Sequence, residues 1–134
     1  MALVINASVA LKWVLQEPDT PLAEALLQMA PDLLVPDFWL GDATNVLWVQ
    51  VRRHRFTPVE ATEALALLHA IIKPIPTWDL GLHQAALEIG VAVNHSTYDT
   101  LYLTFAVAMG ARGVVVADAA FVRDVRIRRW PPCR

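Results

Sequence analysis

The sequence has little of what several protein classes require. Its 134 residues contain one cysteine, Cys133, so no disulfide can form within the chain and we expect a reducing compartment. Only 18% of the residues are charged and 56% are hydrophobic, a balance that excludes a disordered chain. No apolar stretch reaches the roughly 18 residues that a membrane-spanning helix needs, so we expect no membrane association. Residues 1–6 carry no basic side chain, which argues against a secretory signal.

Motifs that mark common enzymes are also missing. The sequence has no glycine-rich phosphate loop, no dinucleotide-binding fingerprint and no serine placed between glycines. The histidines are scattered, and no two of them have the spacing of a zinc-binding pair, so a structural zinc site is not expected. The net charge of −2 comes from 11 basic and 13 acidic residues and provides no overall field that would attract nucleic acid.

The basic residues that are present gather in two clusters. The first cluster is Arg52, Arg53, His54 and Arg55. The second consists of arginines near the C-terminus, namely Arg123, Arg126, Arg128, Arg129 and Arg134. Arginine suits bidentate contacts with phosphate or carboxylate better than lysine does. Composition alone favours solvated ends of helices and strands. The alternatives are contacts with RNA, a partner protein or a second subunit, and the sequence does not rank these three.

Short, β-rich apolar runs alternate with segments of helical periodicity along the chain. Strands are predicted at residues 3–5, 33–36 and 113–117, with edge strands at 73–77 and 126–130. Helices are predicted at residues 9–15, 22–29, 38–54, 58–71, 79–89, 97–109 and 119–125. This alternation predicts one α/β domain over residues 1–134, with a mainly parallel central sheet of four to five short strands and helices on both faces.

Local signals indicate where some of the helices begin and end. Thr57, Pro58 and Glu60 have the pattern of a capping box with proline at the first helical position. Asp37 is placed to cap the helix predicted at 38–54, because a short acidic side chain can accept a free backbone N–H there. Gly90 is placed to end the helix predicted at 79–89.

Four oxygen-bearing side chains stand where chemistry is expected in an α/β fold. Asn6 follows the first strand, where it or Ser8 can also cap the next helix, and Asp118 follows the most apolar strand. Ligands bind outside the carboxyl ends of strands in such sheets. Asp99 lies in the first turn of a helix, and Asp42 interrupts a helix that is apolar around it. Clustered carboxylates repel one another unless a cation neutralises them, and Mg²⁺ prefers hard oxygen ligands. Each acidic residue also has a structural alternative, as a helix cap or a solvated side chain.

Four segments in this order make the sequence recognisable. They are residues 4–13, residues 36–48 with Asp42 and Asn45, residues 95–102 with Asp99, and residues 116–121 with Asp118. In these segments the chain resembles the PIN-domain ribonucleases, specifically the VapC-type toxins of bacterial toxin–antitoxin pairs. No single segment is very specific, but the four occur in family order with matching separations and span most of the chain.

The resemblance implies a PIN-like fold and an endoribonuclease that depends on Mg²⁺ or Mn²⁺. The acidic site of the family maps onto Asn6, Asp42, Asp99 and Asp118. These residues would hold one or two metal ions that activate water for attack on an RNA phosphodiester. The resemblance also implies a cytoplasmic homodimer that is neutralised by a VapB-type antitoxin.

Two of these positions depart from the family pattern, which usually has Asp in place of Asn6 and Glu in place of Asp42. Asp42 keeps the charge but is shorter by one methylene. Asn6 offers only a neutral carbonyl oxygen and cannot accept a proton from water. We interpret Asn6 as the mark of an inactivated or attenuated form, engineered or natural; the alternative is that Asp42, Asp99 and Asp118 suffice.

Two further functions are compatible with the same residues. The first is a catalytically silent PIN-like module that binds a protein partner or RNA, which would show salt-dependent RNA binding without cleavage. The second is another metal-dependent phosphotransfer or hydrolase domain that uses the same carboxylates, which would prefer phosphomonoesters to RNA.

Overall fold

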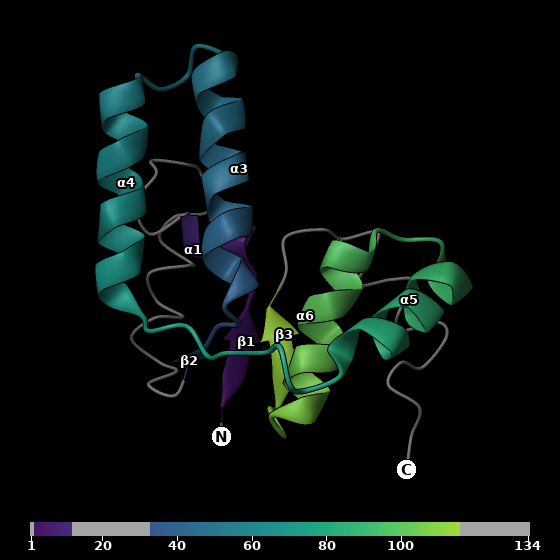
Figure 1. Cartoon of the computed structure of the whole chain (residues 1–134). Helices are drawn as coiled ribbons and strands as arrows, with labels where there is room; N and C mark the ends of the chain where they lie inside the picture. The colour runs from purple at the N-terminus through teal and green to yellow at the C-terminus, as the bar shows by residue number, and fades with distance from the viewer. Residues whose placement is uncertain (1, 12–32, 116–134) are drawn as a thin grey trace.

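The fold is a mixed α/β arrangement around a small parallel sheet (Figure 1). The structure is a computed structural model that describes residues 2–11 and 33–115. The sheet consists of β1 (Leu3–Ile5), β2 (Leu33–Leu34) and β3 (Gly113–Val115) in the order β2-β1-β3. The central strand β1 pairs in parallel with both neighbours, with Leu3 opposite Leu33 on one side and opposite Gly113 on the other. All three carboxyl ends therefore meet at one edge of the sheet.

The predicted parallel sheet is confirmed, but within the described ranges it has three strands rather than four to five. The predicted edge strand at 73–77 is reduced to an isolated parallel bridge between Pro36 and Ile75. Pro74 and Pro76 flank Ile75 and have no backbone N–H, so the ladder cannot extend in either direction. The predicted strand at 126–130 and the predicted helices at 22–29 and 119–125 lie outside the described residues.

Five helices are described: α1 (Ala7–Leu11), α3 (Phe38–Arg52), α4 (Pro58–Ile71), α5 (Leu82–Val93) and α6 (Thr97–Ala108). Figure 1 shows α3 and α4 as a long antiparallel pair on one side of the strands and α5 and α6 on the other side. None of the described helices is both long and apolar enough to cross a membrane.

The core fills the space between the strands and these helices. Burial of its large apolar side chains, each contributing about 1.5–3 kcal/mol, holds the layers together. Its largest fully buried members include Val4, Ile5, Leu11, Val35, Trp39, Leu68, Tyr102 and Phe105.

The N-terminus of α4 is the clearest case of local sequence setting local structure. Thr57 Oγ1 accepts a hydrogen bond of 3.1 Å from the backbone N–H of Glu60, and Glu60 Oε1 accepts one of 3.1 Å from the backbone N–H of Thr57. Pro58 occupies the first helical position. The predicted capping box is confirmed, because these groups are close in sequence and require no tertiary partner.

Two predicted helix signals are wrong. Asp37 precedes α3 but makes no side-chain cap hydrogen bond; its own backbone is already helical. Its carboxylate instead accepts hydrogen bonds from Thr77, 40 residues away. Gly90 does not end a helix but lies inside α5, which ends at Asn94 in a left-handed conformation with φ of 54°. Gly81, with φ of 67°, delays the start of α5 to Leu82.

Candidate functional site

Asn6 lies at the carboxyl edge of the sheet, directly after β1. Its backbone N–H donates a hydrogen bond of 3.2 Å to the carbonyl oxygen of Val115 at the end of β3. Its Oδ1 accepts a hydrogen bond of 3.0 Å from the backbone N–H of Val9, which caps α1. The residue is 7% exposed. The predicted cap is therefore Asn6 rather than Ser8, and the same side chain lies at the predicted site.

Asp42 is half-buried in the first half of α3. Its Oδ2 accepts a hydrogen bond of 3.0 Å from the hydroxyl of Tyr102 in α6. The alternative that Asp42 is merely a solvated surface residue does not hold, because its carboxylate makes a tertiary contact with a buried side chain. The apolar residues next to Asp42 in the sequence belong to the face of α3 that packs against the core, and Asp42 lies at the border of that face.

Asp99 is half-buried in the first turn of α6. The helix begins with Ser96, whose Oγ accepts a hydrogen bond of 3.3 Å from the backbone N–H of Tyr98. The cap is Ser96, so the Asp99 carboxylate is not needed to begin the helix. Its negative charge is favourable near the positive N-terminal end of the helix dipole.

The buried Tyr102 hydroxyl contacts one of these residues, Asp42, directly. Burial raises the pKa of its hydroxyl, and the charge of Asp42 and the hydrogen bond to Asp42 raise the pKa further. A backbone hydrogen bond from Ala7 lowers this pKa, and the charge of Asp99 raises it. The hydroxyl is thus hydrogen-bonded to Asp42 and to the backbone of the residue that follows Asn6, and it senses the charge of Asp99. The contact joins α3 and α6 to the start of α1.

The sequence alone does not mark Tyr102 as a functional residue. Tyr102 follows Asp99 by three positions, so the two side chains lie on neighbouring parts of one helix face. This spacing was the available signal. A tyrosine at that spacing is equally expected in a core, and only the tertiary contact with Asp42 distinguishes the two roles.

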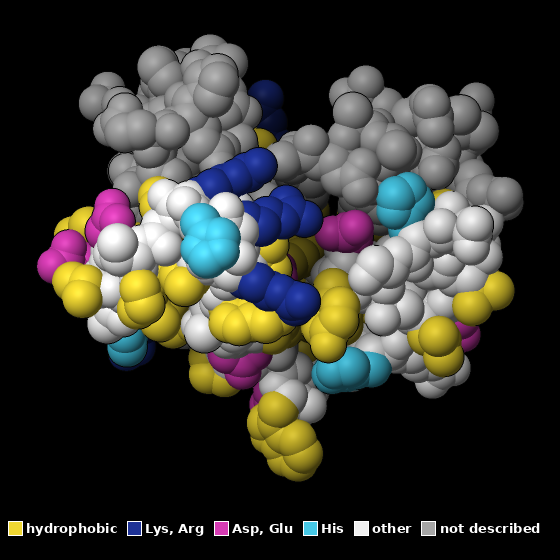
Figure 2. Space-filling view, turned by 90° about the horizontal axis from the view of Figure 1, so that it is seen from above, with side chains coloured by type: hydrophobic (Ala, Val, Ile, Leu, Met, Phe, Trp, Pro, Cys, Tyr) yellow, Lys and Arg dark blue, Asp and Glu magenta, His cyan; other side chains and the backbone are white. Residues whose placement is uncertain are grey.

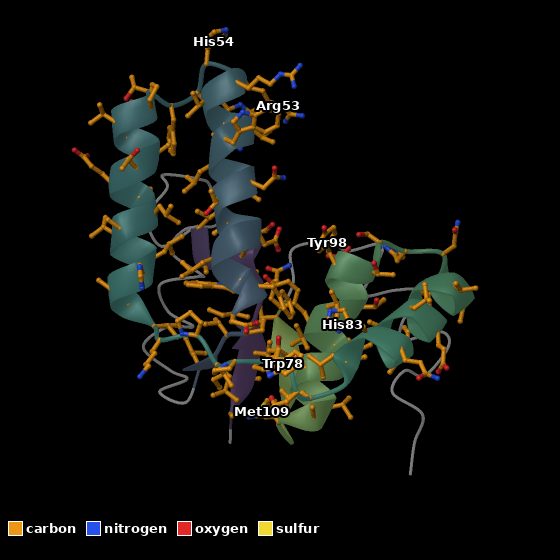
Figure 3. All side chains as sticks on the ribbon, in the orientation of Figure 1. Arg53, His54, Trp78, His83, Tyr98 and Met109 are labelled. Atoms are coloured by element: carbon orange, nitrogen blue, oxygen red, sulfur yellow. The ribbon has the colours of Figure 1, made fainter. Side chains whose placement is uncertain are left out.

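A cavity of about 710 Å³ opens beside Asp42. It is lined by the first half of α3 and the start of α6, through Asp37, Phe38, Gly41, Asp42, Asn45, Ser96 and Tyr98. Tyr98 is 69% exposed at this rim, and Figure 3 shows it at the N-terminal end of α6. The cavity is large enough to admit a nucleotide-sized ligand, since ligand pockets occupy about 300–1,000 Å³.

Basic side chains flank the same face of the molecule. Arg52, Arg53 and Arg55 are exposed at the end of α3, and the Arg52 guanidinium lies 5.4 Å from the centre of the Trp48 ring. Figure 2 shows Lys and Arg side chains along one rim of a hollow, with an acidic side chain across from them. Figure 3 places Arg53 and His54 at the tip of the helical pair. Positive charge therefore lies on the same face of the molecule as an acidic side chain.

The predicted site residues have side chains of the type that binds a hard cation, but the described residues supply only some of the ligands. Asp42, Asp99 and the Asn6 carbonyl oxygen are the oxygen ligands that Mg²⁺ and Mn²⁺ prefer. Within residues 2–11 and 33–115, however, no three His, Cys, Asp or Glu side chains gather closely enough to hold a metal ion. The fourth predicted ligand, Asp118, lies outside the described residues. The set fits such an ion only when Asp118 supplies a third carboxylate.

Comparisons with known proteins bear on the fold alone. No family model and no curated protein matches the chain. Among solved structures, the chain is similar to the crystal structure of PAE2754 from Pyrobaculum aerophilum, with a TM-score of 0.69 and 18% sequence identity. The match covers 92% of this chain and 79% of that one. The two proteins share a fold, and at this identity the likeness carries nothing about activity.

Proposed function

We propose that this chain is a PIN-type endoribonuclease of the VapC toxin kind, attenuated by Asn6. The observation that carries the proposal is the hydrogen bond from the Tyr102 hydroxyl, on the helix of Asp99, to the Asp42 carboxylate. The same hydroxyl accepts a backbone hydrogen bond from the residue that follows Asn6, and Asn6 lies at the carboxyl edge of the parallel sheet, where α/β folds bind their ligands. A cavity of about 710 Å³ opens beside Asp42. The likeness in fold to another α/β protein supports the architecture, and the PIN-like assignment within it belongs to the proposal.

In the proposed mechanism, the acidic side chains would hold Mg²⁺ or Mn²⁺. Asp42, Asp99 and Asp118 would be the anionic ligands, with the Asn6 carbonyl oxygen as a neutral one. The bound ion would lower the pKa of a water molecule and offset charge that develops on the scissile phosphate. Arg52 and Arg53, which are exposed at the end of α3, would contact RNA phosphates away from the reacting bond.

Asn6 accounts for attenuation in physical terms. Its Oδ1 accepts the Val9 N–H, and the side chain carries no negative charge to attract a cation. Asp in its place would preserve the cap, since Asp and Asn cap helices about equally well. An Asn6→Asp substitution therefore adds one charge to the site with little change in the fold. The VapB-type antitoxin, the homodimer and the cytoplasmic setting remain part of this proposal.

The test compares RNA cleavage by the chain and by its Asn6→Asp variant, with Mg²⁺, with Mn²⁺ and with EDTA. We expect metal-dependent cleavage by Asn6→Asp and at least about 10-fold less by the parent, since proton-transfer and charge-stabilising groups each contribute factors of that size or more. Asp99→Asn in the Asn6→Asp background should abolish cleavage. Equal cleavage by parent and Asn6→Asp would show that three carboxylates suffice. Undiminished cleavage by the double variant would overturn the site.

A second function is favoured by one observation. Asn6 already has a complete structural role as the cap of α1, which a silent PIN-like module would retain without catalysis. Such a module would bind RNA with a steep salt dependence or bind a protein partner. Retained RNA binding without cleavage by the folded Asn6→Asp variant, across several structured RNAs, would select this function over the nuclease.

A further inference from the structure

The Tyr102 side chain crosses the site from α6. Its hydroxyl donates to Asp42 Oδ2 in α3 at 3.0 Å and takes a backbone hydrogen bond from Ala7 at the start of α1. One oxygen atom thus links the residue next to Asn6 with the carboxylate of Asp42. Tyr102 also lies in the same helix as Asp99, which precedes it by three positions. Tyr102 therefore contacts Asp42 directly, lies on the helix of Asp99 and is hydrogen-bonded to the residue that follows Asn6.

The Tyr102 ring is held so that the hydroxyl has one position. The residue is 1% exposed. Its ring packs edge-on against Phe38, with ring centres 5.1 Å apart and planes at 74°. Phe38 lies one turn before Asp42 in α3, so the same helix face supplies both the ring contact and the hydrogen-bond acceptor. A buried, edge-packed aromatic ring has little freedom to move its hydroxyl away from Asp42.

The hydrogen bond engages only one oxygen of the Asp42 carboxylate. Asp42 also lines the cavity, and its Oδ1 accepts no hydrogen bond from the residues that the structure describes. A carboxylate whose one oxygen is fixed by a donor presents the other in a defined direction. Groups of this kind, which hold a ligand rather than the ion, usually change metal affinity about 10- to 100-fold when they are removed.

We propose that Tyr102 is a positioning residue that orients the Asp42 carboxylate for a divalent cation. The inference rests on the proposed metal-dependent nuclease and adds a residue to its site. A positioning role also explains why this residue has a hydroxyl group, which packing alone does not require because phenylalanine would fill nearly the same volume. The hydroxyl lies at a buried position where an unpaired polar group would be costly, and its partner is a predicted ligand.

The test measures Mn²⁺ affinity directly, by the loss of the free Mn²⁺ electron paramagnetic resonance signal on titration with protein. The starting protein is Asn6→Asp, and Tyr102→Phe is introduced into it to remove the hydroxyl while keeping the ring. Thr104→Val in the same background is the matched control. It removes another buried hydroxyl of α6, which donates to the Leu101 carbonyl rather than to a predicted ligand. The free energy of unfolding is measured for each protein without metal.

We expect Tyr102→Phe to weaken Mn²⁺ binding by about 10-fold or more and Thr104→Val to leave it within about 2-fold. Both variants should lose a similar free energy of unfolding. A difference in Mn²⁺ affinity between them therefore separates a positioning role of Tyr102 from a merely structural one. Unchanged Mn²⁺ affinity in Tyr102→Phe overturns the inference and leaves the proposed nuclease standing. Equal loss of affinity in both variants also overturns it. Folded Asn6→Asp protein that binds no Mn²⁺ overturns the proposed function, and this inference falls with it.

Discussion

The hydroxyl of Tyr102 lies 3.0 Å from Asp42 Oδ2, and this contact joins two residues that are 60 positions apart in the chain. It links α3 to α6 at the carboxyl edge of the sheet, next to the N-terminus of α1. Four predictions follow from this contact, from two others in the structure and from the proposed metal site.

The first prediction concerns alkaline pH. Burial, Asp42 and Asp99 raise the pKa of Tyr102 above the value of about 10 that an unfolded tyrosine has. Below that pH both states are protonated and the group has no effect. Above it the unfolded chain releases a proton that the folded chain retains, so the free energy of unfolding falls as pH rises. Denaturant titrations from pH 8 to about 11 should show this fall, and Tyr102→Phe should reduce its slope. An identical slope in Tyr102→Phe would contradict the assignment.

The second prediction concerns the link between Asp37 and Thr77. The Asp37 carboxylate accepts hydrogen bonds from the Thr77 hydroxyl at 2.7 Å and from the Thr77 backbone N–H at 3.1 Å. Thr77 is buried, so Thr77→Val leaves the volume nearly unchanged but removes one hydrogen bond to a charged group. We expect a loss of about 1–2 kcal/mol in the free energy of unfolding, measured by urea denaturation.

The matched control for this link is Thr62→Val, which removes an exposed hydroxyl that donates to the Pro58 carbonyl within α4. Its effect should stay within about 0.5 kcal/mol, as for most surface changes. If Thr77→Val were no more destabilising than Thr62→Val, the Asp37 contact would contribute nothing to stability.

The third prediction compares two glycines inside helices. A Cβ on Gly90 would lie 3.0 Å from Thr97 Cγ2 and 3.1 Å from the His95 carbonyl oxygen. That carbonyl belongs to a turn held by the hydrogen bond from the His95 N–H to the Gly90 carbonyl, so it cannot easily withdraw. A Cβ on Gly41 would meet nothing within 4 Å. Gly90→Ala should cost about 1–3 kcal/mol through overpacking, whereas Gly41→Ala should stabilise α3 by up to about 1 kcal/mol.

Thermal or urea denaturation of both glycine variants decides the point. Opposite signs are expected because the helical preference for alanine acts at both positions and only Gly90 faces a neighbouring backbone. A stabilising Gly90→Ala would mean that the segment between α5 and α6 can move away at little cost.

The fourth prediction concerns metal addition and removal. Under the proposed function, Mn²⁺ at about 100 times its dissociation constant should raise the free energy of unfolding of Asn6→Asp by about 2.7 kcal/mol, and EDTA should reverse this. Asp99→Asn should remove most of the gain. Glu63→Gln, at an exposed position on α4, should leave it intact. Denaturation curves with Mn²⁺ and with EDTA provide the measurement, and a gain that persists in Asp99→Asn would exclude Asp99 as a ligand.

The sequence predicted well where short-range interactions decide the structure. The capping box at Thr57 and Glu60 forms as expected because its two hydrogen bonds join groups three residues apart. The parallel sheet was also predictable, since apolar strands alternating with helices leave few other arrangements. The placement of Asn6 after β1 and of Asp99 in the first turn of α6 followed from the same local patterns.

The sequence predicted poorly where a distant partner competes with a local one. Asp37 has the right type and position for a helix cap, yet its carboxylate binds Thr77 because the chain between α4 and α5 passes next to it. Gly90 has the residue type that often ends a helix, but it lies inside α5, where the close approach of the turn before α6 favours a residue without a side chain. The strand predicted at 73–77 forms only one bridge, because the prolines on either side of Ile75 have no N–H to donate.

By itself, the sequence determined the helix and strand types, the start of α4 and the four oxygen-bearing candidates, because these depend on periodicity and on residues a few positions apart. Only the tertiary structure decided that Asp42 contacts Tyr102, and that the Tyr102 hydroxyl joins Asp42 to the residue that follows Asn6. The physical reason is that a buried polar group must find a partner, and which partner it finds depends on how helices far apart in the chain pack together.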